Sequence, residues 1–387
     1  MLIQRFLNQF DYLLFLAVTG LIMVGIVEIY HISAGAGDFS LFMRHLIWVG
    51  MGVLLCLLII FVDYRHWIDH AFLLYILTAG LLLCVLLFGR EINGSKSWFT
   101  IGAISFQPSE ISKVTFILVL ARYLSGISGR YLRLRHLSII GLLTLCPMVL
   151  ITLQGDLGTA LIYLPVVLCI VMVAGLKKQF LIGIPVLMLL MSPLSWFFLE
   201  DYQKERILVT IDPGRDPQGI GYQSRQSQIA IGSGGLLGKG LGQGLQSQLG
   251  FVPEIRTDFI FSILAEETGL AGSIVVLMLY LLVLVRFIRI AESAGDRVGI
   301  FLIVGIASLF FFHVAVNVSM TMGIVPPIGI PLPWLSYGGS FTITNFVALG
   351  MAFSVHQRRF ACSSFFRSNQ HLPRPHLPAP LHNYYNN

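Results

Sequence analysis

The sequence has 387 residues, of which 56% are apolar and only 11% are charged. Soluble domains usually carry about a quarter charged residues, so this composition excludes an ordinary soluble enzyme. It also excludes collagen-like, disordered and disulfide-scaffold proteins. The class that remains is a polytopic membrane protein, in which the positions of the 25 basic and 19 acidic residues are informative.

We predict an all-α polytopic integral membrane protein with ten transmembrane helices. A bilayer core about 30 Å thick requires roughly 20 consecutive apolar residues in a helix. Ten stretches meet this requirement: 11–32, 43–63, 68–88, 108–124, 136–154, 157–175, 179–199, 270–290, 299–323 and 338–356. The first stretch is too long for the core of a signal peptide and is followed by no small-residue cleavage site, which favours a retained anchor.

The basic residues predict the orientation of these helices. Ten spans put both termini on one side, and if that side is cytoplasmic, the inner segments contain 15 of the 25 basic residues. The short outer loops contain only Arg44, Arg90 and Lys96. Because cytoplasmic loops are enriched in Lys and Arg, we expect both termini in the cytoplasm.

Two segments differ from the pattern of spans and short loops. Residues 200–269 form a long outer loop rich in Gly, Gln and charge, and loops of this length are usually functional. We expect short helices in it, one of them over 258–268, before Gly269 and the next span. Residues 358–387 are rich in Pro, His, Asn and Ser, which predicts a disordered cytoplasmic tail. The predicted organisation is therefore one membrane domain, 1–357, followed by this tail.

Charged residues inside or beside a membrane are costly and indicate functional sites by default. Glu110 and Lys113 lie three residues apart at the start of a predicted span, so they share a helix face and can pair. The pair can anchor one helix inside the bundle, and a paired cation near the outer rim can also bind a phosphate. The sequence leaves both roles open.

Two other polar residues stand at the outer ends of predicted spans. Asp156 lies in a short turn, where it can cap the following helix or contribute to a site. Trp98 lies in an outer loop, where a Trp is ordinarily a membrane anchor, although an aromatic ring also stacks on sugar faces. The sequence does not decide between these interpretations.

The long outer loop contains Arg206 and a Gly-rich run over 232–240. A nucleotide-binding P-loop is excluded, because Ser233 stands where its first Gly belongs and Gly240 follows Lys239 where Ser or Thr is required. We expect the glycines to allow tight turns and close backbone packing at the membrane surface.

Asp258 is the most informative acid of the loop. Thr257 is a good N-cap, which would place Asp258 in the first turn of a helix, a position that stabilises by under about 1 kcal/mol. The clustering of acids here with Arg206 and Arg256 favours a site. The Pro-rich segment 326–340 cannot form a regular helix, so at membrane depth it must be buried in protein or line a cavity.

Six segments in this order resemble the SEDS family (shape, elongation, division and sporulation). They read NGSKSW, QPSEISK, QGDLGT, QSQIAIGSGG, RTDFIFSILAEE and LSYGGS, at 93–98, 107–113, 154–159, 226–235, 256–267 and 335–340. The resemblance extends from about residue 10 to 357. Three segments are more similar to the elongation members of the family than to the division members: 238–240, 246–248 and 329–333. The tail matches no motif of the family.

The resemblance implies a peptidoglycan glycosyltransferase that polymerises lipid II on the outer face of the bacterial cytoplasmic membrane. The donor would be a glycan chain on undecaprenyl pyrophosphate and the acceptor the 4-hydroxyl of a GlcNAc of lipid II, with inversion to a β-1,4 bond. The family's essential carboxylate corresponds to Asp258. The family's activity or substrate positions correspond to Trp98, Glu110 and Lys113, and less closely to Asp156 and Arg206.

The chemistry of these residues agrees with that activity. Glycosyl transfer needs a base for the acceptor proton, which Asp258 can supply. The pyrophosphate leaving group needs cations to stabilise its negative charge, and Lys113 and Arg206 are the candidate residues. A bound divalent cation, Mg²⁺ or Mn²⁺, is a further candidate. The sequence has no Asp-x-Asp ligand pair, and it indicates no metal ligand.

The resemblance also implies partners and two alternative functions. Family members act with a class B penicillin-binding protein, a transpeptidase, and with other membrane proteins of the elongation complex; no nucleic acid is expected. The alternatives are a lipid II flippase and a non-catalytic scaffold for the transpeptidase. A flippase needs polar residues through the membrane, whereas here the charges gather on the outer rim, which favours an enzyme.

Overall fold

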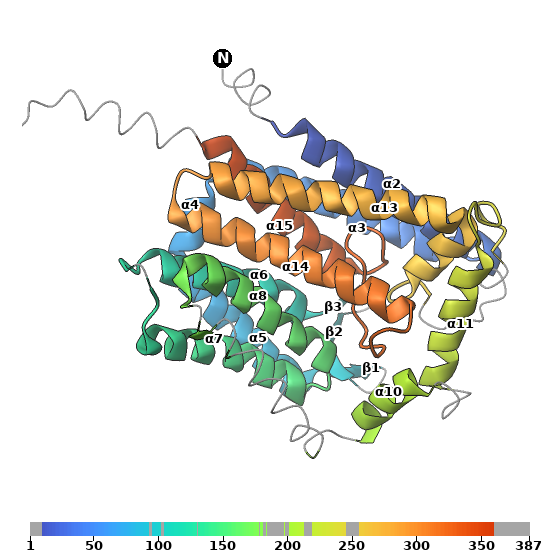
Figure 1. Cartoon of the computed structure of the whole chain (residues 1–387), viewed down its shortest axis with the longest axis horizontal. Coiled ribbons are helices and arrows are strands. Elements are labelled where there is room, and N and C mark those ends of the chain that lie inside the picture. Colours follow the sequence, from blue (N-terminus) through green and yellow to red (C-terminus); the bar gives the residue numbers. More distant parts are fainter. Residues whose placement is uncertain are drawn as a thin grey trace, which may run out of the picture.

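The computed structural model of the protein describes residues 10–92, 95–101, 104–129, 131–177, 179–180, 183, 197, 201–212, 219–244 and 255–359. Its fold is a bundle of long helices with one small sheet (Figure 1). The helices are α2 (Tyr12–Ala36), α3 (Ser40–Phe61), α4 (Tyr64–Asp69), α5 (Ala71–Phe88), α6 (Pro108–Ser125), α7 (Leu134–Leu153), α8 (Leu157–Gly175), α10 (Asp201–Ile211), α11 (Ile220–Ser233), α13 (Ile260–Ser293), α14 (Arg297–Thr321) and α15 (Gly339–Arg358). The strands are β1 (Arg90–Ile92), β2 (Ser95–Ile101) and β3 (Ile104–Phe106).

Seven of the described helices are long and apolar enough to cross a membrane: α2, α3, α5, α7, α8, α13 and α14. The protein is therefore a multi-pass membrane protein. The predicted spans 108–124 and 338–356 coincide with α6 and α15, which are more polar because most of their residues are buried in the bundle rather than facing lipid. The predicted span 179–199 lies largely outside the described residues.

The prediction of an all-α fold misses a three-stranded antiparallel sheet with the order β1-β2-β3. Trp98 on β2 pairs with Arg90 on β1, and Thr100 on β2 pairs with Ser105 on β3. The sequence predicts an outer loop for this stretch. Two of the three strands are only three residues long, and strands as short as that give almost no periodic signal.

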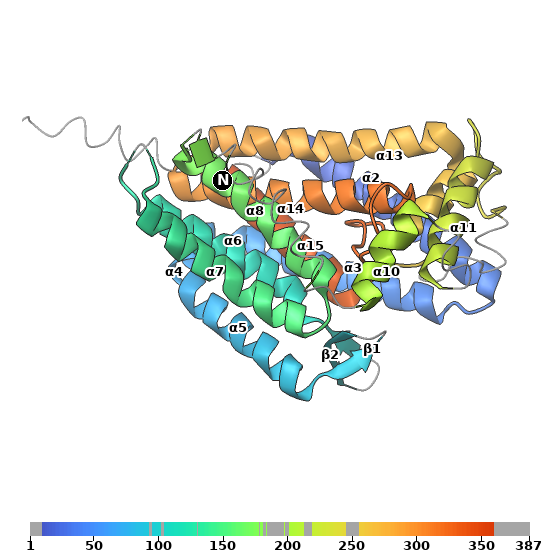
Figure 2. The same cartoon turned by 60° about the horizontal axis from the view of Figure 1, so that its bottom comes forward.

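Helix α14 is the central helix of the bundle. It packs against α6, α8, α13 and α15, while α3 packs against α15 and α2 against α13. The sheet, α10 and α11 lie toward one end of the bundle, which we call the sheet end, and α4 lies at the opposite end, the α4 end (Figure 2). The two ends therefore have different surroundings for their polar residues.

Helix α13 consists of two helices joined at a kink. Gly269 has φ 67° and ψ −163°, a conformation that favours glycine, and it separates 260–268 from the apolar span. This agrees with the prediction of a separate helix that ends before Gly269. The predicted N-cap is wrong, however, because the helix starts at Ile260 after Phe259 and no side chain caps it. Thr257 and Asp258 lie in a turn before the helix.

The Gly-rich run wraps around the carboxyl end of the helix 260–268. The amides of Lys239 and Gly240 donate to the carbonyls of Glu266 and Glu267, both at 3.0 Å. A Cβ at Gly238 would lie 2.1 Å from the Glu267 carbonyl oxygen, so only glycine fits there. The expected close backbone packing is confirmed, and it serves to cap a helix.

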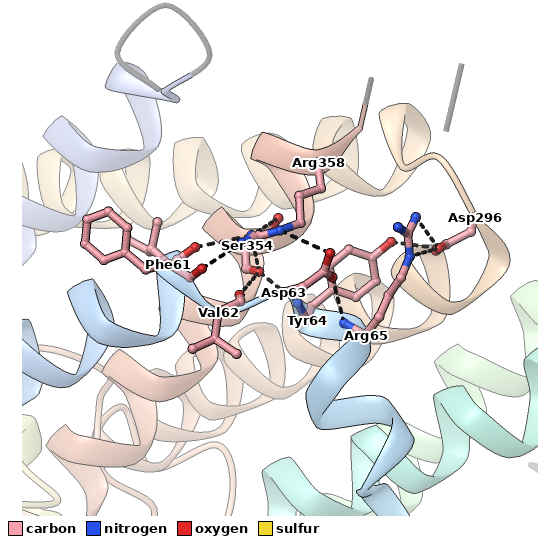
Figure 3. Close-up of polar contacts among 9 residues, drawn as sticks. Phe61, Val62, Asp63, Tyr64, Arg65, Asp296, Ser354 and Arg358 are labelled. Atoms are coloured by element: carbon pink, nitrogen blue, oxygen red, sulfur yellow. Dashed lines mark hydrogen bonds and ion pairs between the residues drawn. The ribbon is translucent and has the colours of Figure 1, made fainter. Parts of the chain in front are cut away.

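A polar network joins the helices at the α4 end (Figure 3). Asp296 caps α14 by accepting from the Gly299 amide at 2.8 Å, and it also accepts from the Tyr64 hydroxyl at 2.7 Å and from Arg65. Arg358 donates to the carbonyls of Ile60 and Phe61 at the end of α3, at 3.2 and 3.0 Å. Arg358, assigned to the tail from the sequence, is therefore the last residue of α15, and residues 360–387 lie outside the described residues.

Candidate functional site

Glu110 and Lys113 form a buried ion pair at the start of α6. Pro108 occupies the first turn of this helix, where its missing N–H costs no hydrogen bond. The Lys113 Nζ atom lies 2.9 Å from Glu110 Oε1, and the two residues are only 3% and 4% exposed. The predicted pairing is confirmed. Lys113 Nζ also lies 3.2 Å from Nε2 of His313 on α14, so the cation joins two helices.

Asp156 caps α8 and also connects that helix to α6. Its Oδ1 accepts from the Thr159 amide at 3.1 Å, as the capping interpretation predicts, and its Oδ2 accepts from Gln107 Nε2 at 3.0 Å. Burial raises the pKa of Asp156, while the Thr159 hydrogen bonds and the charges of Lys113 and Arg206 act in the opposite direction. Asp156 therefore lies within the electrostatic range of both cations.

Arg206 and Trp98, the other two predicted substrate residues, lie on other elements. Arg206 is half-buried on α10, and its charge acts on Asp156. Trp98 is half-buried on β2, which is attached to the turn before α8 because the Lys96 amide donates to the Gln154 carbonyl at 2.8 Å. The substrate roles of both residues stay predictions.

Asp258 is half-buried in a turn in which three successive backbone carbonyls, those of residues 256–258, accept hydrogen bonds from α14 and from the segment after it. The Tyr337 amide donates to the Arg256 carbonyl at 2.9 Å, and the Ser336 hydroxyl donates to the Thr257 carbonyl. Asn317 Nδ2 donates to the Asp258 carbonyl at 2.8 Å. These donors explain why the turn is not the first turn of a helix: its carbonyls have other partners.

The Pro-rich segment lies inside the bundle, as its sequence predicts. Residues 322–338 contain no helix between α14 and α15, and Ile330 and Leu332 are 2% and 0% exposed. A Cβ built on Gly329 would lie 3.5 Å from Asp258 Oδ2, so the Asp258 carboxylate faces this segment. The irregular backbone is thus both buried in protein and adjacent to the predicted base.

His313 and Asn317 were missed by the sequence analysis, although both stand within the apolar span 299–323. His313 Nδ1 lies 3.2 Å from the Pro331 carbonyl, and Asn317 Nδ2 donates to the Ile330 carbonyl at 2.7 Å. Their signal was available, because polar residues four apart in an apolar helix share one face and rarely occur there without a function.

The described residues can carry out acid–base and anion-binding chemistry at the sheet end. A half-buried carboxylate, Asp258, is connected through α14 to the Lys113 cation, and Lys113 and Arg206 both act on Asp156. Within the described ranges, no group of three or more His, Cys, Asp or Glu is arranged to hold a metal ion. We assign no step of the reaction to a metal.

Known proteins resemble this chain in sequence and in fold. The sequence model of the FtsW/RodA/SpoVE family, whose members are described as cell cycle proteins, matches residues 8–360 of this chain. The peptidoglycan glycosyltransferase MrdB of Escherichia coli K12 is 39% identical over 329 residues, which cover 84% of this chain and 88% of MrdB. Among solved structures, one chain of a peptidoglycan synthase complex is 34% identical to this chain and superposes with a TM-score of 0.79. The rod shape determining protein RodA of Thermus thermophilus is 32% identical and superposes with a TM-score of 0.69. Each of these two matches covers 91% of this chain and 98% of the other chain. The resemblance of its motifs to the shape, elongation, division and sporulation proteins is confirmed, and the chain belongs to the FtsW/RodA/SpoVE family.

Proposed function

We propose that the protein is a peptidoglycan glycosyltransferase that polymerises lipid II into β-1,4-linked glycan strands during cell elongation. Family membership and the names of MrdB and RodA support this activity and its elongation role. The observation that carries the proposal is a set of links at the sheet end: Lys113 and Arg206 both act on Asp156, and α14 contacts Lys113 through His313 and the Asp258 turn through Asn317.

In the proposed reaction, Asp258 is the general base. The acceptor 4-hydroxyl oxygen forms a bond to the anomeric carbon of the donor while the bond from that carbon to the undecaprenyl pyrophosphate breaks, and the hydroxyl proton passes to the Asp258 carboxylate. The departing pyrophosphate gains negative charge, which Arg206 and Lys113 stabilise. Arg206 is half-buried and can contact the phosphates directly. Lys113 is buried in the bundle and acts on them through its positive charge.

We place this chemistry on the outer face of the cytoplasmic membrane. Seven described helices can span a bilayer, and α6, α15 and the stretch 179–199 complete the proposed ten. The 15 basic residues that this ten-span arrangement puts on one side support a cytoplasmic position for both termini and an outer position for the sheet end. The same proposal divides the chain into a membrane domain and a cytoplasmic tail. The sequence predicts the boundary after residue 357, and we move it to after Arg358, because α15 ends at that residue.

We propose that the chain works with a class B penicillin-binding protein and with other elongation-complex membrane proteins. A similar chain is part of a peptidoglycan synthase complex in which polymerization and crosslinking are coordinated. A transpeptidase partner would receive the glycan strands that this chain makes. The proposed substrates are lipid II and the glycan held on undecaprenyl pyrophosphate.

The test is polymerisation of labelled lipid II by the purified chain, alone and with its transpeptidase partner. Because Asp258→Asn keeps the shape of the side chain but lowers its basicity, we expect it to reduce the rate by about 100-fold or more. The matched control is Asp69→Asn at the α4 end, where the side chain is 62% exposed and pairs with Arg122, and we expect normal activity.

Near-wild-type polymerisation by a folded Asp258→Asn chain would refute Asp258 as the base. Absence of polymer from the wild-type chain, with and without the partner, would favour a scaffold. Transfer of lipid II across liposomes by the chain alone, without polymer, would favour a flippase.

A further inference from the structure

Two polar residues on the inner face of α14 are placed where a transmembrane helix ordinarily has apolar ones. His313 and Asn317 are four residues apart, which puts them on one side of the helix. They are 3% and 0% exposed, and their neighbours along α14 are mostly apolar. Since burying polar groups without partners is costly, their hydrogen bonds indicate what they do.

Asn317 bridges two segments with one nitrogen atom. Its Nδ2 lies 2.8 Å from the Asp258 carbonyl and 2.7 Å from the Ile330 carbonyl. Both neighbours are acceptors, so the amide must present its NH₂ group and not its oxygen to them. Each of the two hydrogens therefore has its own carbonyl, one in the Asp258 turn and one in the Pro-rich segment.

His313 makes the equivalent connection one turn away. Its Nδ1 lies 3.2 Å from the Pro331 carbonyl, which can only accept, so Nδ1 carries the proton. In the neutral ring Nε2 then has a lone pair, and Lys113 Nζ donates to it at 3.2 Å. The adjacent carbonyls of Ile330 and Pro331 are thus bound by the same face of α14, and each side chain reaches one group of the proposed site.

We propose that His313 and Asn317 are positioning residues that fix the proposed base and the proposed phosphate cation relative to each other. Asn317 acts through the backbone of Asp258, and His313 acts through the ammonium group of Lys113. This inference rests on the proposed function, because it assigns separate tasks within that reaction. Helix α14 thus sets the separation between Asp258, which accepts the proton, and Lys113, which stabilises the anion.

The two residues should therefore affect different kinetic constants. Asn317→Ser removes at least one of the two bridging hydrogen bonds, and displacement of a catalytic group by about 1 Å can lower a rate by roughly 100-fold. We expect Asn317→Ser to lower kcat by about that factor while KM for lipid II stays near the wild-type value. His313→Leu removes both contacts of the ring, and we expect it chiefly to raise KM, by about 10-fold.

Conservative variants and a matched control separate positioning from general damage. His313→Gln keeps a donor for Pro331 and an acceptor for Lys113 and should restore most of the lost affinity. Asn345→Ser is the control, because Asn345 is a buried Asn on the neighbouring helix α15, 4% exposed, and its Nδ2, unlike that of Asn317, has no hydrogen-bond partner among the described residues. We expect wild-type kinetics from Asn345→Ser.

Hydrogen–deuterium exchange of the full-length chain supplies a readout that does not depend on activity. We expect Asn317→Ser to accelerate exchange over 255–260 and 328–337 and not in α5 or α7. Unchanged kcat in Asn317→Ser, unchanged exchange in these segments, or an equal loss in Asn345→Ser would each overturn the inference. If the wild-type chain forms no polymer, the proposed function fails, and the exchange experiment alone still decides whether Asn317 holds the Asp258 turn.

Discussion

The network around Asp296 and Arg358 at the α4 end is half-buried, the group around Glu110, Lys113 and Asn317 at the sheet end is buried, and the polar atoms of the two are satisfied to different degrees. At the α4 end, both carboxylate oxygens of Asp296 and all three guanidinium nitrogens of Arg358 have protein partners (Figure 3). Trp67 Nε1 and Gln357 Nε2 are also buried toward the α4 end without a partner among the described residues, but neither belongs to that network. At the sheet end, Glu110 Oε2, Ser109 Oγ and Asn317 Oδ1 are buried and have no hydrogen-bond partner within the described part of the chain.

This difference separates two uses of a costly group. A buried polar atom without a partner costs about 1–3 kcal/mol, so a fully satisfied network contributes to the fold, whereas an incompletely satisfied one reduces stability. Active sites commonly keep such destabilising groups because a substrate or a transition state completes them. We therefore expect substitutions in the α4-end network to change stability alone, and substitutions at the sheet end to change activity, with a loss of stability as well where a buried charge loses its partner.

The largest effect should come from Lys113→Met. Loss of the ammonium leaves the carboxylate of Glu110 buried without its counter-charge, which destabilises by about 3–5 kcal/mol. We expect a large fall in the melting temperature of the purified chain and no polymerisation. The double variant Glu110→Gln/Lys113→Met removes both charges, so it should recover most of the stability without recovering activity. A stable and active double variant would show that the pair is only an anchor.

A smaller effect, on stability alone, should follow Arg358→Ala. This change removes the donors to the end of α3 and the pair with Asp63, and we expect a loss of about 2–3 kcal/mol. Polymerisation per folded molecule should be normal. The tail gives a matched pair of truncations: removal of 358–387 should destabilise as Arg358→Ala does, whereas removal of 360–387 should not. Equal melting temperatures for the two truncations would contradict this role.

The sequence was sufficient to predict the spans that composition determines and the polar residues that stand out locally. The Glu110–Lys113 pair, the Asp156 cap and the kink at Gly269 each depend on residues within four positions of one another. The links between them are different, because Asn317 is 59 residues from Asp258, and Lys113 is 200 residues from His313. Such contacts depend on how the helices pack, which no local pattern in one sequence specifies.

The same limit explains the incorrect N-cap. Thr257 has the right side chain for a cap, but its carbonyl is bound by Ser336, a residue 79 positions away. Together with Tyr337 and Asn317, this donor draws the segment out of the helix. The local preference of Thr for an N-cap was therefore overridden by tertiary hydrogen bonds that only the packed bundle supplies.

The smallest effect should come from an ion pair that belongs to neither network. Arg122 and Asp69 lie 2.9 Å apart, but their side chains are 47% and 62% exposed, and exposed pairs contribute little because water and salt screen them. We expect Arg122→Ala to change the free energy of unfolding by under about 0.5 kcal/mol, with normal polymerisation. Arg65→Ala is the informative comparison, because Arg65 is similarly exposed at 40% but pairs with Asp296 inside the network. If Arg122→Ala and Arg65→Ala lower the free energy of unfolding by the same small amount, membership of the network adds no stability to an exposed ion pair. The stability assigned to the α4 end would then have to come from Arg358 alone.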